Sequence, residues 1–275
     1  MNAGPARPAD RSTAHAAATR SSNPTGGSTG GPAGARSDRA DKTRQTILYA
    51  AVHHFSQHGL AGARIDAIAK TAGVNKALLY YYFQNKSSLY RAALEDAAGK
   101  VVESAIASLA SGASAGERLL RLVLNHFDRI SAQRELQSLM QQEMVRFHRG
   151  ESDVMPLVAR SLYGPLLKRM QAVVREGIRS RELCETDWMQ ILYAALGANI
   201  FYFLSAPLMR LAVGFEPLDA AALEARRKSA MEFLGQALFC DRDHGSKLAR
   251  RVLAETPMPK PTATAKKLAA ARKYL

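Results

Sequence analysis

Cysteine is scarce in this chain, and that scarcity excludes folds that depend on disulfides or on cysteine-bound metals. Among 275 residues there are two cysteines, Cys184 and Cys240. Two are too few for a disulfide framework, and they form no paired metal motif. A redox-sensing pair is the alternative to the interpretation we favour, which is two inert thiols in a reducing cytoplasm.

Segments typical of β-strands and of secretion are also missing. Alternating β-branched runs and hairpin dipeptides do not occur, so we expect no sheet. Residues 1–41 lack the apolar segment of a signal peptide and are rich in Gly, Pro, Ser, Thr and Ala. Because such a composition buries too little surface to offset the entropy of ordering, it predicts a disordered tail. These absences favour an all-α, cytoplasmic protein.

Motifs of enzyme sites are absent as well. The sequence has no glycine-rich phosphate loop, no Gly-x-Ser-x-Gly elbow and no HExxH. His53, His54 and His58 cluster together, and the last two have a spacing that suits a metal, but no cysteine or close carboxylate completes a ligand set. We therefore expect no catalytic residues, no metal site and no cofactor.

Positive charge is abundant and unevenly placed, giving a formal net charge of +14. Residues 42–100 hold eight basic and three acidic side chains, and residues 245–275 hold eight and one, whereas residues 101–244 hold seventeen of each. A basic module beside a neutral domain is typical of a protein that binds a polyanion. Residues 245–275 are predicted to be a basic tail that either aids solubility or adds affinity for DNA.

Apolar periodicity and Gly or Pro breaks predict a succession of helices. They span 42–58, 65–72, 75–81, 86–109, 116–132, 134–149, 154–180, 187–209 and 218–240, with breaks at Gly59, Gly73, Gly112, Gly150 and Gly214–Pro217. The expected organisation is a tail over 1–41, a small module over 42–100, a helical domain over 101–244 and a tail over 245–275.

One segment is long enough to test for a membrane span. From Trp188 to Met209 there are 22 residues without a formal charge. Four residues within it are polar or break helices, namely Gln190, Asn199, Ser205 and Pro207. No flanking charge asymmetry favours insertion. Because a helix that is apolar most of the way round can also be buried in protein, we expect no membrane partner.

The short helices after residue 42 carry the functional signal. Ile47, Ala51 and Phe55 give the first helix an apolar face, and Gly59 ends it. Gly73 follows the second helix and can take the positive φ that a tight turn between steeply crossing helices needs. The outward residues of the third are polar, cationic, small or aromatic: Asn75, Lys76, Ala77, Leu78, Tyr81 and Tyr82. A helix with that outer face suits the major groove of DNA.

Lys86 places a cation at the start of the following helix. It comes directly after Asn85, a candidate N-cap, so it lies at the positive end of the helix dipole. That placement costs about 0.3–1 kcal/mol. It becomes favourable when an anion such as a DNA phosphate docks at the same helix end. The alternative is a solvated surface lysine, and we expect the phosphate contact.

The run from Ile65 to Leu94 resembles the DNA-binding domain of the TetR (tetracycline repressor-like) family. The resemblance rests on an apolar residue followed by xxIAxxAGV, then Lys76, Leu79-Tyr80, Phe83 and Lys86, and it covers about residues 42–100. It implies a three-helix helix-turn-helix domain followed by a helical ligand-binding and dimerisation domain. It also implies a homodimer, usually a repressor, that binds a palindromic operator in double-stranded DNA and releases it when a small-molecule effector binds.

The resemblance assigns roles to individual residues. Asn75 and Lys76 match positions near the start of the recognition helix that contact bases or backbone. Tyr80 and Tyr81 match a tyrosine pair of which at least one reaches a phosphate. Lys86 matches the phosphate-contacting lysine.

Four positions differ from the usual family residues. Tyr82 stands where His is frequent, and Ala77 stands where Gly is frequent. Arg64 occupies the place of a Thr or Ser that caps the second helix, which puts that cap in doubt. Leu78 replaces a small polar residue and would favour contact with a thymine methyl group over a hydrogen bond.

The neutral domain is expected to hold the effector. Methionine and other apolar residues on helices 134–149 and 154–180, Phe147 among them, indicate an adaptable pocket, with His126, Gln142 and Tyr163 as polar handles. Each of these residue types is more often simply part of a hydrophobic core. Helices 187–209 and 218–240 resemble the family's dimerisation helices. The alternative function is a non-enzymatic helical scaffold, or a membrane-associated protein whose basic ends bind anionic surfaces.

Overall fold

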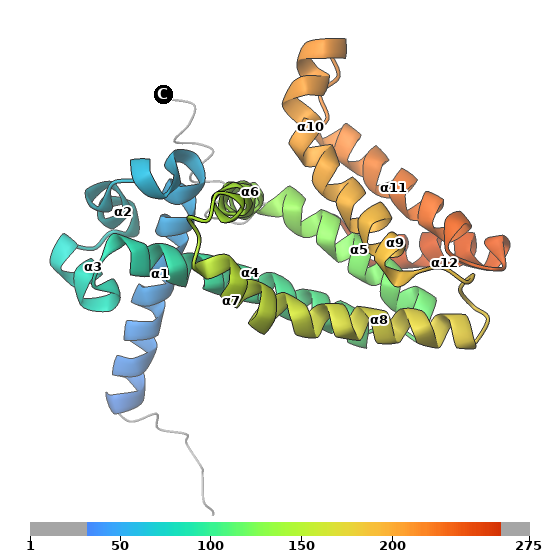
Figure 1. The fold of residues 1–275 in the computed structure, drawn as a ribbon, viewed down its shortest axis with the longest axis horizontal. Coiled ribbons are helices and arrows are strands. Elements are labelled where there is room, and N and C mark those ends of the chain that lie inside the picture. The colour runs from blue at the N-terminus through green and yellow to red at the C-terminus, as the bar shows by residue number, and fades with distance from the viewer. Residues whose placement is uncertain (1–31, 260–275) are drawn as a thin grey trace, which may run out of the picture. The chain divides into compact units, whose positions relative to one another are not determined.

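The computed structural model describes residues 32–259, and within this range it is built of helices (Figure 1). The α-helices are α1 (Pro32–Gly62), α2 (Ile65–Ala72), α3 (Lys76–Phe83), α4 (Lys86–Ala110), α5 (Ala115–Ala132), α6 (Arg134–His148), α7 (Val154–Val158), α8 (Gly164–Arg179), α9 (Trp188–Ile191), α10 (Ala198–Val213), α11 (Ala220–Ala237) and α12 (Arg242–Glu255). Two π-helical segments, Ala159–Tyr163 and Leu192–Gly197, lead into α8 and α10. The only β-pairing in the described range is a single bridge between Leu183 and Phe239, so the expected all-α fold is confirmed.

Part of the predicted N-terminal tail is helical. Helix α1 begins at Pro32, so residues 32–41 are helical where a disordered tail was expected to reach residue 41. Proline is well suited to the first turn of a helix, because its missing N–H would have no intrahelical partner there. Residues 1–31 lie outside the described range. By its contacts the chain divides at Asp41, and the second unit, from Lys42 onward, contains both hydrophobic cores.

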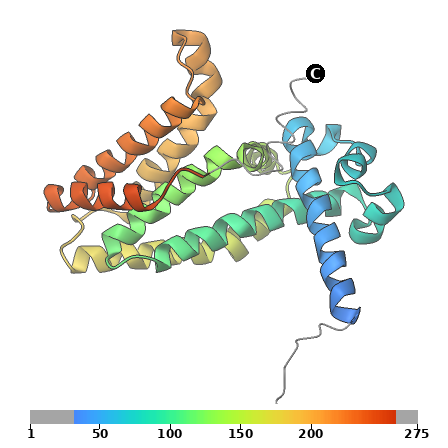
Figure 2. The same cartoon turned by 180° about the vertical axis from the view of Figure 1, so that it is seen from behind.

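The predicted C-terminal tail is also wrong over its first part. Residues 242–255 form α12, which packs on α11 and α5 and is drawn in red in Figure 2. Leu248, Ala249 and Val252 recur at helical spacing and are buried in the core of the larger domain. The sequence predicted a tail because this segment is rich in positive charge. The partner of Arg251, Glu117, lies far away in sequence and could not be inferred from it. Residues 260–275 lie outside the described range.

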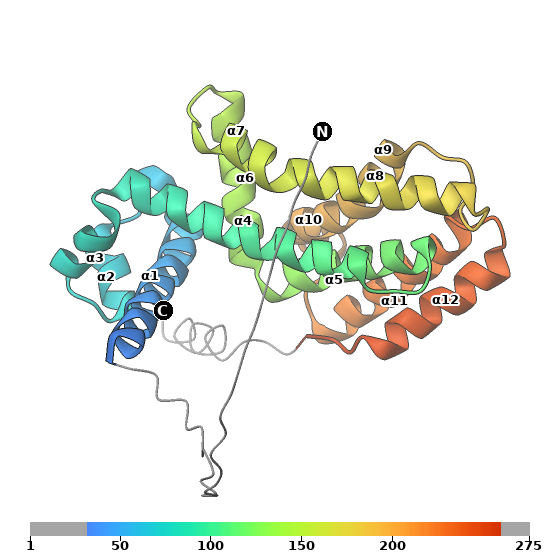
Figure 3. The same cartoon turned by 90° about the horizontal axis from the view of Figure 1, so that it is seen from below.

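Helix α4 contributes to two hydrophobic cores. Leu89 and Leu94 in its first half pack with α1, α2 and α3, and Leu139 of α6 joins this core. Val102 and Leu109 in its second half pack with α5, α8, α11 and α12. Figure 3 shows α4 running from the α1–α3 module toward α5. The module and the larger domain are therefore joined by one continuous helix.

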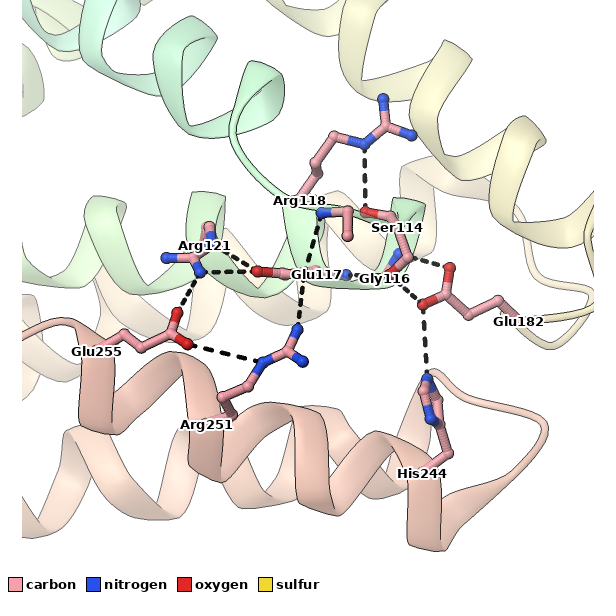
Figure 4. Close-up of polar contacts among 10 residues, drawn as sticks. Ser114, Gly116, Glu117, Arg118, Arg121, Glu182, His244, Arg251 and Glu255 are labelled. Atoms are coloured by element: carbon pink, nitrogen blue, oxygen red, sulfur yellow. Dashed lines mark hydrogen bonds and ion pairs between the residues drawn. The ribbon is translucent and has the colours of Figure 1, made fainter.

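A cluster of ion pairs ties α12 to α5 (Figure 4). The Glu117 carboxylate, with a side chain 6% exposed, accepts from Arg121 at 2.7 Å and from Arg251 at 2.8 Å. Glu255 binds the same two arginines. The hydrogen bonds from the guanidinium groups and from the Ala113 amide lower the pKa of Glu117 against the opposing effect of burial. Several charges that share partners stabilise more than isolated surface pairs do.

A buried pair makes a second connection between α11 and α5. Arg227, 5% exposed, donates to both carboxylate oxygens of Asp128 at 2.8 and 2.9 Å. The guanidinium also donates to the backbone carbonyl of Thr256, just past α12. Burial raises the pKa of Asp128, and the Arg227 guanidinium opposes that rise. Because each group satisfies the other, removing either one would leave a buried charge without its partner.

His126 of α5 lies half-buried next to α10. Asn199 of α10, 1% exposed, donates to the carbonyl of Val123 at 3.1 Å, and its amide nitrogen lies 3.5 Å from His126 Nδ1. Burial lowers the pKa of His126 to about 4. The imidazole is therefore neutral at pH 7 in the folded chain.

We expect Leu248→Ala in α12 to lower the free energy of unfolding by about 2–5 kcal/mol, because it removes buried apolar contacts. Denaturant unfolding followed by circular dichroism measures the change. The matched control is Lys247→Ala, the more exposed neighbour on the same helix, which should change little. Equal and small effects of both substitutions would show that α12 does not pack on the domain.

The environment of His126 predicts a loss of stability on acidification. An unfolded histidine has a pKa near 6.5 and binds a proton as the pH falls below it, while the folded form resists until about pH 4. Full stability is thus present above pH 6.5, and about 2 kcal/mol should be lost between pH 7.5 and 5. His126→Gln should flatten this pH dependence in denaturant titrations. An unchanged pH slope in the variant would contradict the buried neutral state.

Candidate nucleic-acid interface

The turn between α2 and α3 has the geometry expected from its glycine. Gly73 adopts φ 67° and ψ 28°, and its N–H and that of Val74 close hydrogen bonds onto the last turn of α2. A Cβ at this position would meet no atom within 4 Å, so the backbone conformation alone requires glycine. At the end of α1, Gly59 likewise takes a positive φ, 66°, and breaks the helix. The predicted end of α2 is confirmed, and the predicted break at Gly59 is a kink three residues before the end of α1.

Asn75 fixes the start of α3. Its side-chain oxygen accepts a hydrogen bond from the Leu78 amide at 2.7 Å, which satisfies one of the free donors of the first turn. The carboxamide oxygen is thus used inside the helix, and its NH₂ group is the part that can donate to another molecule. Asn75 is therefore an N-cap first, a role that was not predicted for it.

Lys76 connects α3 with α2. Its ammonium group lies 2.9 and 3.2 Å from the two carboxylate oxygens of Asp66. The hydrogen bond and the charge of Asp66 raise the pKa of Lys76. Both side chains are more than half exposed, so water screens the pair and it adds little stability. The pair holds a cation at the start of α3.

The outer face of α3 is apolar and aromatic. Tyr81 is 81% exposed, Tyr80 38% and Leu78 37%, and Ala77 is exposed between them. Tyr82 differs from the prediction, because it is half-buried against the rings of Tyr81 and Phe83. The inner face carries Leu79 and Phe83, both buried in the module core.

The start of α4 shows an interaction that the sequence did not reveal. Asn85 and Ser88 form a reciprocal capping box, with bonds of 2.8 and 3.2 Å, so α4 begins at Lys86 as predicted. The Lys86 ammonium donates to the carbonyl of Ala61 at 2.8 Å. Ala61 lies at the C-terminal end of α1, where carbonyls lack intrahelical partners. The hydrogen bond to Ala61 holds the Lys86 ammonium group in position and does not require a bound anion.

Two arginines flank the module. Arg64 precedes α2 in extended conformation and makes no side-chain cap, in agreement with the doubt raised by its identity. Arg44 of α1 lies over the ring of Phe83, 5.6 Å from its centroid, at the end of α3. Arg44 was not among the predicted site residues, because nothing in the local pattern of α1 indicates that it reaches α3.

A buried hydrogen bond joins the module to α6. The Tyr90 hydroxyl of α4 donates to Glu143, whose side chain is fully buried, and Arg146 donates to the same carboxylate at 2.8 Å. The Tyr90 ring also contacts Phe55 of α1 edge to face, with centroids 5.0 Å apart. Burial and the hydrogen bond to Glu143 raise the pKa of Tyr90. This connection was not predicted either, since its partners are 53 positions apart.

The four expected effector residues do not come together. His126 lies half-buried beside Asn199, and Gln142 donates to the carbonyl of Ser56 at 2.7 Å, where it supports the end of α1. Phe147 is 44% exposed on the surface of α6. Tyr163 packs against both cores, and burial raises its pKa.

Two cavities in the described range are lined by residues other than these four. One of about 250 Å³ lies between α5, α10 and α11 and is lined by Val123, Ala194, Ala195, Ala198, Asn199, Arg226, Ala230, Phe233 and Leu234. The other, of about 290 Å³, lies between α1, α4 and the α5–α6 turn and is lined by Gln45, Leu48, Tyr49, Val52, His53, Asp96, Ala97, Lys100, Ala132, Gln133, Glu135 and Leu136. None of the four predicted effector residues lines either cavity.

Comparison with known proteins agrees with this geometry. The family model for bacterial regulatory proteins of the tetR family matches residues 47–93, which cover much of α1, all of α2 and α3, and the start of α4. The HTH-type transcriptional repressor NicS of Pseudomonas putida is 45% identical over 62 residues. That match covers 22% of this chain and 29% of the repressor, so it spans less than a third of the relative's length.

Solved structures extend the likeness of fold. A putative transcriptional regulator from Saccharomonospora viridis in complex with choline aligns with a TM-score of 0.58 at 18% identity, over 72% of this chain and 98% of that one. The regulator FadR from Bacillus subtilis in complex with stearoyl-CoA aligns with a TM-score of 0.54 at 22% identity, over 69% and 96%. At these identities the alignments show a shared fold. Residues 47–93, which include the helix-turn-helix, therefore match bacterial regulatory proteins of the tetR family, and the helical domain behind them shares the fold of the solved regulators.

Proposed function

We propose that this chain is a dimeric transcriptional repressor that binds a palindromic operator through α3 and releases it when a small molecule binds the larger domain. The observation that carries the proposal is the outer face of α3, exposed beside the paired cation Lys76 and held by a tightly folded module of the TetR family. An exposed helix of this kind fits the major groove, and cations around it fit the phosphate backbone.

The contacts within this surface divide into two kinds. Ala77 and Leu78 protrude from the first turn of α3, where small and apolar side chains fit thymine methyl groups. Lys76, Asn75 and the exposed Tyr81 provide donors for bases or phosphates. Tyr80, Tyr82, Arg64 and Lys86 surround this patch and are assigned to the backbone or to its support. Sequence specificity would then depend on few side chains, and affinity mainly on charge.

The dimer interface is assigned to α10 and α11. These helices lie next to one another (Figure 1) and, with the segments that flank α10, carry apolar side chains that are between 47% and 84% exposed. They are Tyr193, Phe201, Leu204, Leu208, Leu211, Val213, Phe215 and Phe233. Clustered exposed apolar side chains of this kind are typical of an interaction surface, and a twofold axis would cover them with the same surface of a second copy.

The helical segment that includes α10 is also the one on which the membrane alternative depends. Trp188–Val213 is the one helical stretch in the described range that is long and apolar enough to cross a bilayer, and 22% of its most apolar window is buried. Against a span, Asn199 in its middle is bonded to α5, and Pro207 interrupts its backbone hydrogen bonds. A dimer accounts for the exposed side chains and keeps these contacts with α5.

Effector control would act through α4. Because α4 belongs to both cores, a change in packing of the larger domain tilts the helix on which the module is mounted. The half-sites of such dimers lie about 34–36 Å apart, so a small change in spacing breaks the register of the two recognition helices. The likeness to regulators that hold choline or stearoyl-CoA supports a ligand in this domain and leaves its chemistry open.

Binding to DNA from the region around its own gene tests the proposal. Operator affinity should fall in Lys76→Ala and in Lys86→Ala, and for Lys86 the loss should be similar on specific and random DNA, with a salt slope smaller by about one unit. Fluorescence anisotropy at several salt concentrations measures both.

The matched control is Lys168→Ala, which removes the same charge from an exposed site on α8. Thermal unfolding of each variant shows whether loss of the Lys86–Ala61 hydrogen bond has destabilised the fold. A weaker affinity without such destabilisation is then due to the lost contact with DNA. If Lys86→Ala left affinity and salt slope unchanged, Lys86 would serve only to hold α1. If the wild-type protein failed to prefer any such DNA over scrambled sequence, the proposed function would be wrong.

Leu211→Glu should convert the dimer to a monomer, because it places a charge on the most exposed apolar side chain of the proposed interface, and should weaken operator binding at least tenfold, by about 1.4 kcal/mol or more. Light scattering after size exclusion measures the mass. Val145→Glu, an exposed apolar residue on α6, is the control and should remain dimeric. If the Leu211→Glu variant remained dimeric, the dimer interface would lie elsewhere.

A further inference from the structure

The two cysteines of the chain lie next to each other in the fold. Cys184 is in the loop between α8 and α9, and Cys240 is in the turn between α11 and α12. Neither position has a sequence signal that connects it to the other. The connection is made by the backbone of the residues beside them.

That backbone forms a short antiparallel bridge. Leu183 pairs with Phe239, the Cys184 amide donates to the Leu238 carbonyl at 3.0 Å, and the Cys240 amide donates to the Glu182 carbonyl at 3.1 Å. Successive side chains of extended segments point to opposite faces. Leu183 and Phe239 are both 2% exposed and point into the core, so both cysteines lie on the opposite, outer face.

The two thiols interact and can be reached from solvent. A hydrogen bond between the two sulfur groups is the main cause that raises the pKa of Cys240. Cys240 is exposed and Cys184 is half-buried. Small oxidants can therefore reach two thiols that lie on the same face of one backbone bridge.

The surroundings hold the two segments in place. Leu183 packs on Gly177 and Phe239 packs on Gly116 and Gly245, where an added Cβ would lie only 2.3–2.7 Å from the neighbouring side chains. Glu182 accepts hydrogen bonds from Ser114 and from the Gly116 amide, at the start of α5 (Figure 4). The loop and the turn are therefore fixed to a common support, while the cysteines themselves lie in irregular backbone that can adjust to the geometry of an S–S bond.

We propose that Cys184 and Cys240 form a reversible intramolecular disulfide when the protein meets a hydroperoxide. The Cys184 sulfur, as thiolate, attacks the peroxide; an S–O bond forms, the O–O bond breaks, and the departing hydroxide takes up the thiol proton as water. Cys240 then attacks the resulting sulfenic acid; the S–S bond forms, the S–O bond breaks, and a second water leaves. The peroxide gains two electrons, and each sulfur gives up one.

The bond would link the α8–α9 loop covalently to the α11–α12 turn. Both segments belong to the domain that carries α10 and α11, so its rigidity would depend on redox state. The alternative is that the thiols are inert despite their contact. The two cases differ in covalent chemistry that can be measured without DNA, so the result is independent of the proposed function.

Purified, reduced protein titrated with hydrogen peroxide tests the proposal. We expect both free thiols to disappear together, the chain to lose two hydrogen atoms in mass, and a non-reduced digest to contain a linked peptide pair with Cys184 and Cys240. The protein should run as a single chain on a non-reducing gel, and dithiothreitol should restore both thiols. In denaturant the linkage should form at least about tenfold more slowly, because the native contact supplies the proximity.

Cys240→Ser and Cys184→Ser are the matched variants. Cys240→Ser should accumulate a sulfenic acid on Cys184 that dimedone traps, while the wild type should show little adduct because Cys240 resolves it. The oxidised wild type should unfold at a higher temperature than the reduced form, and neither variant should show this shift. Loss of thiols without a linked peptide pair, or linkage only between different chains, would overturn the proposal.

Discussion

The packing of α4 in two cores is the constraint on which the rest of the structure depends. Its first half completes the core of the α1–α3 module, and its second half is embedded against α5 and α8. The Tyr90–Glu143 hydrogen bond adds a polar contact at the junction, in a place where an unpaired group would be costly. The module therefore cannot change its orientation without a change in the packing of α6 or of the larger domain.

Long-range polar contacts connect the helices of the larger domain. On α5, Glu117 binds Arg251 of α12 and Asp128 binds Arg227 of α11. In the α8–α9 loop, Glu182 accepts a hydrogen bond from the Gly116 amide at the start of α5. These contacts bring α12 into the core and pair Arg251, one of its four basic side chains, with Glu117 and Glu255. The α1–α3 module carries a basic excess of its own, which is where the proposed function places the polyanion.

Local patterns predicted the features that depend on neighbours in sequence. Gly73, the capping residue Asn85 and the apolar spacing of α2 and α3 each act within one turn of helix, so they could be interpreted from the chain alone. The position of α12 depends on Glu117 meeting Arg251, and the site of Gln142 depends on the carbonyl of Ser56. Such pairs have no periodicity, which is why neither the packing of α12 nor the hydrogen bond of Gln142 could be predicted from the sequence.

The bond between Lys86 and Ala61 has a consequence for the entropy of recognition. A free lysine side chain loses up to about 1.5–2 kcal/mol of rotamer freedom when it is immobilised. Here that freedom is already restricted by the end of α1, and an ammonium group has three N–H donors, of which the Ala61 carbonyl takes one. A phosphate that approaches the first turn of α4 would meet a cation that is largely ordered before the encounter, so less of the interaction energy is spent on ordering it.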